Sequence, residues 1–128
     1  MDAAYANRLI DRYTQGWLKS DSAAILDTLD ENCEIIESHG STYKGKGHVS
    51  GWLEGWKSSR SSVTKWDILS FVFDGQKSAV EWDFECITRG KAYRIRGMSW
   101  VEFRNEKIYS IHEYCMTNSP YAAPAVYE

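Results

Sequence analysis

Apolar residues near the N-terminus recur with the spacing of one helical face. The i, i+3, i+4, i+7 pattern predicts an amphipathic helix from about Ala3 to Lys19, followed by a second short helix that Ser20 or Asp21 would cap. The residues on the apolar face of the first helix are Ala6, Leu9, Ile10, Tyr13 and Trp17. The same spacing returns after the glycine-rich stretch 40–47 and predicts a third helix there.

From Val63 to near the C-terminus, the pattern becomes that of β-strands, and shorter strands are expected at 34–38 and 42–43. The long runs are Val63–Phe73, Ser78–Thr88, Lys91–Phe103 and Lys107–Met116. The dipeptides between them suit hairpin turns: Asp74-Gly75, Arg89-Gly90 and Asn105-Glu106. Helices followed by a meander of strands predict an α+β fold, in which helices cover one face of an antiparallel sheet.

The hairpin at Arg89-Gly90 has one register that separates charged from apolar residues. It places Asp83 opposite Arg96, and Glu85 opposite Arg94. Opposite charges across a strand pair are favourable, so the register supports both the hairpin and its faces. The other face carries three further pairs: Cys86 with Tyr93, Phe84 with Ile95, and Trp82 with Gly97. We expect the charged face to meet solvent or a second copy of the chain.

Length and net charge limit the number of domains and the kinds of partner that we expect. The 128 residues, 43% hydrophobic, fit a single domain over 1–128 with an irregular tail from about residue 118. The net charge of −3 argues against a nucleic-acid partner, and no basic run indicates a membrane surface. The first residues do not resemble a signal peptide, and no apolar run approaches the roughly 20 residues of a membrane helix. We therefore expect a cytoplasmic protein.

Cysteine and histidine spacing indicates neither a disulfide framework nor a metal site. The odd number of cysteines and their wide spacing fit reduced thiols: Cys33, Cys86 and Cys115. The histidines are too far apart for a zinc site: His39, His48 and His112. Because no P-loop, GxGxxG or EF-hand pattern occurs either, we expect no metal and no cofactor.

Several segments together resemble a known superfamily. They are Gly16–Asp21, Glu34–Glu37, Tyr43–Gly47, Gly97–Arg104 and Lys107-Ile108. Over about residues 3 to 117, the chain resembles the nuclear-transport-factor-2-like superfamily, which includes SnoaL-like polyketide cyclases and ketosteroid isomerases. The resemblance implies a cystatin-like cone, in which a strongly curved sheet wraps around the N-terminal helices and encloses a pocket. It also implies a homodimer through the open sheet face.

The resemblance to ketosteroid isomerases implies catalytic roles for Tyr13 and Glu37. Those enzymes hold a tyrosine eight residues before the aspartate that opens the second helix, as Tyr13 precedes Asp21, and a general base sixteen residues after it, as at Glu37. Tyr13 would then stabilise an oxyanion by donating a hydrogen bond, and Glu37 would transfer a proton as the general base. Their second oxyanion donor is a protonated aspartate, and Ser99 stands in its place as a weaker acid.

The resemblance to polyketide cyclases implies a second acid/base residue, Glu113. Those enzymes carry an aspartate on the last strand, six residues after the start of a Lys-Ile pair, and counting from Lys107 gives Glu113. A two-residue turn at Asn105-Glu106 would instead put His112 on the face of Ser99. We favour Glu113, which requires a bulge in the last strand.

Aromatic residues supply the wall of the expected pocket. They are Trp17, Trp52, Trp56, Trp82, Phe84 and Tyr93. Ser99 is expected as a small polar wall residue, and His39 as a neighbour that tunes Glu37. The faces of Trp66 and Trp100 are less certain, although Trp100 shares the Arg96 face and suggests a dimer contact.

Three functions fit this pattern. The first is a cofactor-independent acid/base isomerase, cyclase or dehydratase that acts on a small apolar carbonyl compound. The second is a module that binds a small apolar molecule without chemistry, and the third is a dimerising interaction domain. The sequence leaves the choice among them open.

Overall fold

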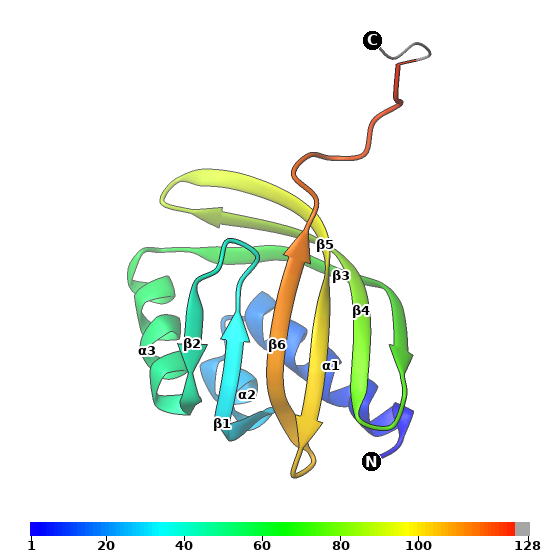
Figure 1. Cartoon of the computed structure of the whole chain (residues 1–128). Coiled ribbons are helices and arrows are strands. Elements are labelled where there is room, and N and C mark those ends of the chain that lie inside the picture. The colour runs from blue at the N-terminus through cyan, green and yellow to red at the C-terminus, as the bar shows by residue number, and fades with distance from the viewer. Residues whose placement is uncertain (125–128) are drawn as a thin grey trace.

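The computed structural model describes residues 1–124 (Figure 1). The helices are α1 (Ala3–Leu18), α2 (Ser22–Asp27) and α3 (Gly45–Ser58). The strands are β1 (Leu29–Ile36), β2 (Thr42–Lys44), β3 (Ser62–Phe73), β4 (Lys77–Thr88), β5 (Lys91–Arg104) and β6 (Lys107–Cys115). The predicted order of helices first and long strands later is confirmed.

The strands form a six-stranded sheet in the order β2-β1-β6-β5-β4-β3. The sheet curves around α1, which lies on its concave side, and α3 packs beside β1 and β2 at one edge (Figure 1). The predicted fold class is confirmed, with one departure: β1 and β6 run parallel, whereas the other neighbours are antiparallel. A long crossover through α3 and four strands, β2 to β5, lets β6 return beside β1 in the same direction.

The first two helices begin at capping aspartates. The Asp2 carboxylate accepts a hydrogen bond from the Tyr5 N–H at 2.8 Å, and the Asp21 carboxylate accepts one from the Ala24 N–H at 3.1 Å. The predicted apolar face of α1 is buried against the sheet. These caps fix where α1 and α2 start, and therefore which side chains of α1 point into the cone.

The chain turns directly after β1, so Glu37 lies outside the strand. The Glu37 N–H donates to the Ser41 carbonyl at 2.9 Å, and the Gly40 N–H donates to the Glu37 carbonyl at 2.8 Å. Gly40 has φ of 99°, a conformation that glycine adopts without steric cost. The strand predicted at 34–38 therefore begins earlier and ends at Ile36.

The hairpin between β4 and β5 has the predicted register. Arg89 and Gly90 form the turn, both with positive φ, as a two-residue hairpin turn of type I′ requires. Asp83 lies opposite Arg96, and the guanidinium donates two hydrogen bonds to the carboxylate, at 2.7 and 3.0 Å. This ion pair marks the outer face of the sheet, while Trp82 and its neighbours on the alternate positions face α1.

A bulge decides which residue of β6 faces inward. Asn105 and Glu106 form the expected two-residue turn, but the register shifts by one residue between Glu102 and Phe103. After the shift, Glu113 lies opposite Ser99. The bulge that the family resemblance implied is therefore present.

Gly97 permits a close approach between three strands. A Cβ atom at this position would lie 2.9 Å from both the Cys115 Cα and the Trp82 Cη2. The Trp82 indole N–H donates to the Ser99 hydroxyl at 2.9 Å and fixes the ring over Gly97. The missing side chain thus makes room for Trp82 inside the cone.

No helix within residues 1–124 is long and apolar enough to cross a membrane. All three cysteines carry free thiols, with Cys33 and Cys86 buried and Cys115 exposed.

We expect Gly97→Ala to lower the free energy of unfolding by about 1–3 kcal/mol, the usual cost of overpacking. The reason is that backbone atoms of β6 occupy the space of the new methyl group. Gly55→Ala is the matched control: open space surrounds this position on α3, so the change should stabilise by about 0.5–1 kcal/mol. Urea unfolding of both variants measures the difference. Equal stabilities would contradict the close approach at Gly97.

Candidate functional site

A cavity of about 390 Å³ lies inside the cone, between the helices and the concave face of the sheet. Its wall is mostly aromatic and aliphatic, and its polar groups are few. The lining residues are Tyr13, Trp17, Glu37, Ser38, His39, Trp52, Trp56, Val63, Trp66, Trp82, Phe84, Cys86, Thr88, Tyr93, Ile95 and Glu113. An enclosed apolar space with a small number of polar groups is the usual form of a small-molecule site.

The structure brings the sequence-predicted site residues together, with one exception. The residues proposed for chemistry, Tyr13, Glu37 and Glu113, all line the cavity, as do the predicted aromatic wall and His39. Ser99 does not. Its hydroxyl accepts the hydrogen bond from Trp82, and it borders a separate void of about 20 Å³, roughly the space of one water molecule.

Glu113 is the most perturbed carboxyl group of the site. It stands on β6 and faces inward because of the bulge. Burial in the apolar cavity, with a smaller contribution from the negative charge of Glu37, raises its pKa to about 8. At neutral pH, Glu113 is therefore mostly a neutral carboxylic acid, which can donate a hydrogen bond.

Glu37 enters the cavity from the turn after β1, in a more polar setting. Its carboxylate accepts a hydrogen bond from the Tyr43 hydroxyl at 3.0 Å, and the His39 Nε2 lies 3.6 Å from the same oxygen. About a quarter of its side chain, 26%, is exposed. Burial and the bond to Glu37 raise the pKa of Tyr43 to about 12, so Tyr43 remains a donor to this carboxylate.

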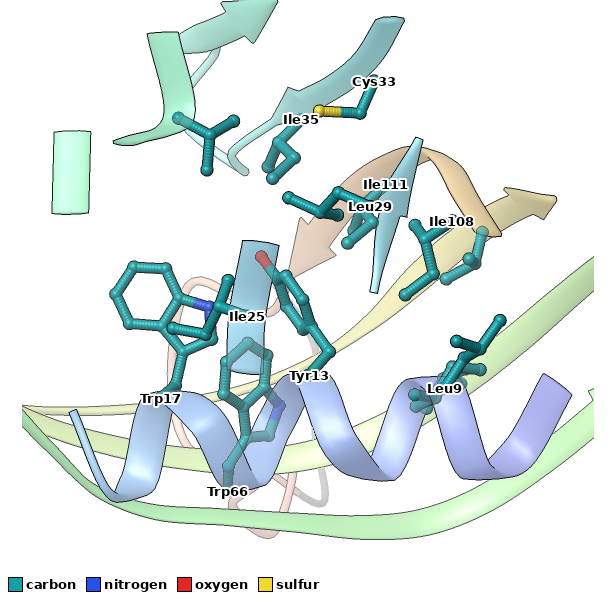
Figure 2. Close-up of a cluster of buried hydrophobic side chains, with 14 of the residues drawn as sticks. Leu9, Tyr13, Trp17, Ile25, Leu29, Cys33, Ile35, Trp66, Ile108 and Ile111 are labelled. Atoms are coloured by element: carbon teal, nitrogen blue, oxygen red, sulfur yellow. The ribbon is translucent and has the colours of Figure 1, made fainter. Parts of the chain in front are cut away.

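Tyr13 rises from α1 beside Trp17, and Trp66 lies across the same part of the helix (Figure 2). Burial is the main cause that raises the pKa of Tyr13 well above its ordinary value, and the charge of Glu113 adds to it. Tyr13 is therefore a protonated phenol over the whole physiological range. It can donate a hydrogen bond into a site that also holds Glu113.

Trp66 and Tyr43 are site residues that sequence reasoning missed. Trp66 lies opposite Phe84 in the β3–β4 pair, with ring centroids 5.1 Å apart. Register shifts on either side of it break the alternation of β3, which hid its face. Tyr43 stacks on Trp52 at 4.0 Å while it bonds Glu37, a role that its predicted short strand alone could not indicate.

Residues 1–124 contain no group of three or more histidine, cysteine or acidic side chains placed to hold a metal ion.

The raised pKa of Glu113 makes stability depend on pH. The folded state keeps this proton to higher pH than the unfolded state, so the stabilising effect of the bound proton is complete below about pH 4.5 and is lost as pH rises through about 8. We expect Glu113→Gln to be more stable than the wild type at pH 8 by at least about 1.4 kcal/mol, the equivalent of one pKa unit, and about equal to it at pH 4. Urea unfolding at both pH values measures this. The exposed control Glu54→Gln should show no such difference, and equal stability of Glu113→Gln and wild type at pH 8 would contradict the buried acid.

Solved structures of other proteins share this fold. An LEH-like epoxide hydrolase from M. tuberculosis has a TM-score of 0.79 at 13% identity, over 88% of this chain and 84% of that chain. A putative polyketide cyclase from Xanthomonas campestris pv. campestris has a TM-score of 0.71 at 17% identity, over 87% and 90%. A protein with a ketosteroid isomerase-like fold from Catenulispora acidiphila DSM 44928, in complex with trimethylamine, has a TM-score of 0.70 at 16% identity, over 83% of each chain.

These identities are low, so the likeness to the solved structures concerns the fold alone. No curated protein matches this chain in sequence at a significant level. A family model described as the SnoaL-like domain matches residues 10–111, which is most of the chain. The protein belongs to the SnoaL-like domain family.

Proposed function

We propose that this protein is a cofactor-independent acid/base enzyme that isomerises, cyclises or dehydrates a small carbonyl compound. The observation that carries the proposal is the pair of carboxyl groups in one aromatic cavity. Glu113 is buried among apolar groups with a pKa of about 8, whereas Glu37 accepts a hydrogen bond and is partly exposed. Two carboxyl groups in such different surroundings can take opposite roles, one as acid and one as base.

The proposed chemistry begins with removal of a proton from the carbon next to the carbonyl. The Glu37 carboxylate accepts this proton, and the electron pair of the C–H bond moves to form an enolate. Glu113 as a neutral acid and Tyr13 as a phenol donate hydrogen bonds to the enolate oxygen. In a β,γ-unsaturated substrate, return of the proton from Glu37 to the γ-carbon completes an isomerisation. In a substrate with a second carbonyl, attack of the enolate carbon and transfer of the proton from Glu37 to the new alkoxide complete a cyclisation. In a β-hydroxy substrate, departure of the hydroxyl with this proton as water completes a dehydration.

The aromatic wall supports this chemistry by limiting water. Trp17 packs against Trp52 and Trp56, with ring centroids 5.0 and 5.8 Å apart, and all three line the cavity. Hydrogen bonds to a developing charge are stronger in such a low-dielectric space than in water. The trimethylamine complex of the Catenulispora acidiphila protein supports the idea that the fold accepts small organic molecules.

A second candidate function is binding without catalysis. Ser99 lies outside the cavity, beside the separate small void, so the site lacks one donor that the ketosteroid isomerase comparison would require. An aromatic cavity with this loss could still bind an apolar molecule. In that case, ligand affinity would depend on the wall and be nearly indifferent to Glu37.

We also propose that the outer sheet face forms a homodimer contact. Trp100, Val72 and Tyr114 are 42%, 64% and 59% exposed on this face, beside the Asp83–Arg96 ion pair. Two such faces would cover apolar area and bring matching ion pairs together. We expect Trp100→Glu to shift the protein from dimer to monomer in sedimentation-velocity experiments, since it places a charge in the contact. A wild-type monomer would contradict the proposed contact.

Deuterium exchange provides a test of the proton transfer that does not depend on knowing the product. Wild-type protein in D₂O with a panel of cyclic ketones and polyketide fragments should exchange the protons next to one of the carbonyls, as followed by NMR. We expect Glu37→Gln to slow this exchange about 10²–10⁴-fold, the usual contribution of a positioned base. Tyr13→Phe should slow it as well, by loss of an oxyanion donor.

The control is Glu54→Gln, which removes a carboxylate from the outer side of α3 and should leave exchange unchanged. Full exchange activity in Glu37→Gln would overturn its role as base. Ligand binding without exchange of any substrate would favour the binding module.

A further inference from the structure

The cavity contains acidic groups without a lysine or arginine to balance them. Glu37 enters from the turn after β1, and Glu113 enters from β6. Among the described residues, 1–124, no lysine or arginine lines the cavity, and His39 is the one basic side chain in the wall. Two carboxyl groups that share an apolar space oppose each other's ionisation, as the effect of Glu37 on the pKa of Glu113 indicates.

The cavity is also lined by electron-rich rings. Five of the six tryptophans of the chain lie in its wall. Trp17 meets Trp56 at 85°, and Trp66 meets Phe84 at 83°, so neighbouring rings stand at right angles instead of stacking face to face. The wall is therefore built largely of indole rings, and the face of an indole attracts a cation more strongly than any other aromatic side chain.

We propose that this cavity binds an organic cation, a tertiary or quaternary ammonium group, between the indole rings and beside Glu37 and Glu113. The inference rests on the proposed function in that it uses the same cavity and adds the charge of the substrate; with such a substrate Glu113 is ionised, and Tyr13 alone donates to the enolate oxygen. A cation of this kind is weakly hydrated, so it loses little on entering an apolar space. It also supplies the positive charge that the two carboxyl groups lack, which neither a neutral nor an anionic molecule can do.

One cation already lies against the rim of this wall. The Lys91 ammonium is 5.3 Å from the centroid of the Tyr93 ring, and Tyr93 lines the cavity near the β4–β5 turn. Lys91 itself is exposed and does not line the cavity. The interior therefore remains without a fixed positive charge, and a ligand would have to provide it.

Choline and 3,3-dimethylbutan-1-ol form a matched pair of probes, because they share shape and differ in the positive charge. Tryptophan fluorescence can follow both titrations, since most of the indoles line the cavity. We expect choline to bind at least tenfold more tightly than the neutral alcohol at pH 8. Equal affinity for the two probes, or no binding of choline, would overturn the inference.

Three variants locate the binding. Trp56→Leu should weaken choline binding at least tenfold, whereas Trp100→Leu, on the outer face of the sheet, should leave it unchanged. Glu37→Gln should weaken choline binding but leave the neutral alcohol unaffected. Because Glu37→Gln changes no shape, it keeps the test decisive even if Trp56→Leu fails to fold.

The pH dependence separates this inference from the catalytic one. Choline should favour the ionised form of Glu113, so its affinity should rise between pH 6 and about 8 and then level off. The other titratable groups around the cavity are Tyr13, Glu37, His39, Cys86 and Tyr93, with Lys91 at the rim. Glu113→Gln should lose this rise in affinity. The double variant Glu113→Gln/His39→Gln tests whether His39 contributes to the pH dependence.

A rise that persists unchanged in Glu113→Gln would overturn the pairing of the cation with Glu113. Loss of deuterium exchange in Glu37→Gln together with equal affinity for the two probes would retain the proposed enzyme and reject the cation. Preferential choline binding without any exchange would retain the cation and reject the enzyme.

Discussion

The cavity depends on the place where Trp82 crosses β5, because that strand has no side chain there. With Gly97 beneath it and the Ser99 hydroxyl bonded to its N–H, the indole is held in one orientation inside the cone. Trp82 then separates the small void near Ser99 from the main cavity, since it borders both. The neighbouring rings of Trp66 and Phe84 pack edge-to-face against it and continue the wall. The two carboxyl groups therefore meet this wall of packed rings differently, Glu113 within it and Glu37 at a partly exposed edge.

That environment explains why two residues of the same chemical type differ. Glu37 lies in a turn, where Tyr43 and solvent can stabilise its negative charge. Glu113 lies on a strand within the apolar wall, where the neutral form is favoured. The difference arises from backbone position, so it is a property of the fold rather than of the local sequence. It also means that any bound molecule with a charge changes the protonation of the site.

The sequence predicted the β4–β5 hairpin correctly because charge pairing and alternation agreed on a single register. It also predicted most of the cavity wall, since large aromatic residues on the inner face of a cone have few other places to lie. The sequence pattern placed Glu37 on a strand, because it contains no signal for the backbone hydrogen bonds of the turn that ends β1 at Ile36. Ser99 was expected at the pocket, but its donor partner, Trp82, comes from a neighbouring strand. Trp66 was uncertain because bulges in β3 interrupt the period of two.

The bulge in β6 determines which side chain of this strand faces the cavity. Tyr109 is the extra residue that the bulge accommodates: if Tyr109 instead paired regularly with Glu102, the period of two would bring His112 opposite Ser99 and turn Glu113 to the outer face. His112 now lies on that outer face, with its Nε2 3.5 Å from the Glu34 carboxylate. A one-residue shift of pairing therefore separates a cavity with a buried carboxylic acid from one with an imidazole. A change in where β6 bulges would give this scaffold a route between two kinds of acid/base chemistry without any substitution in the site.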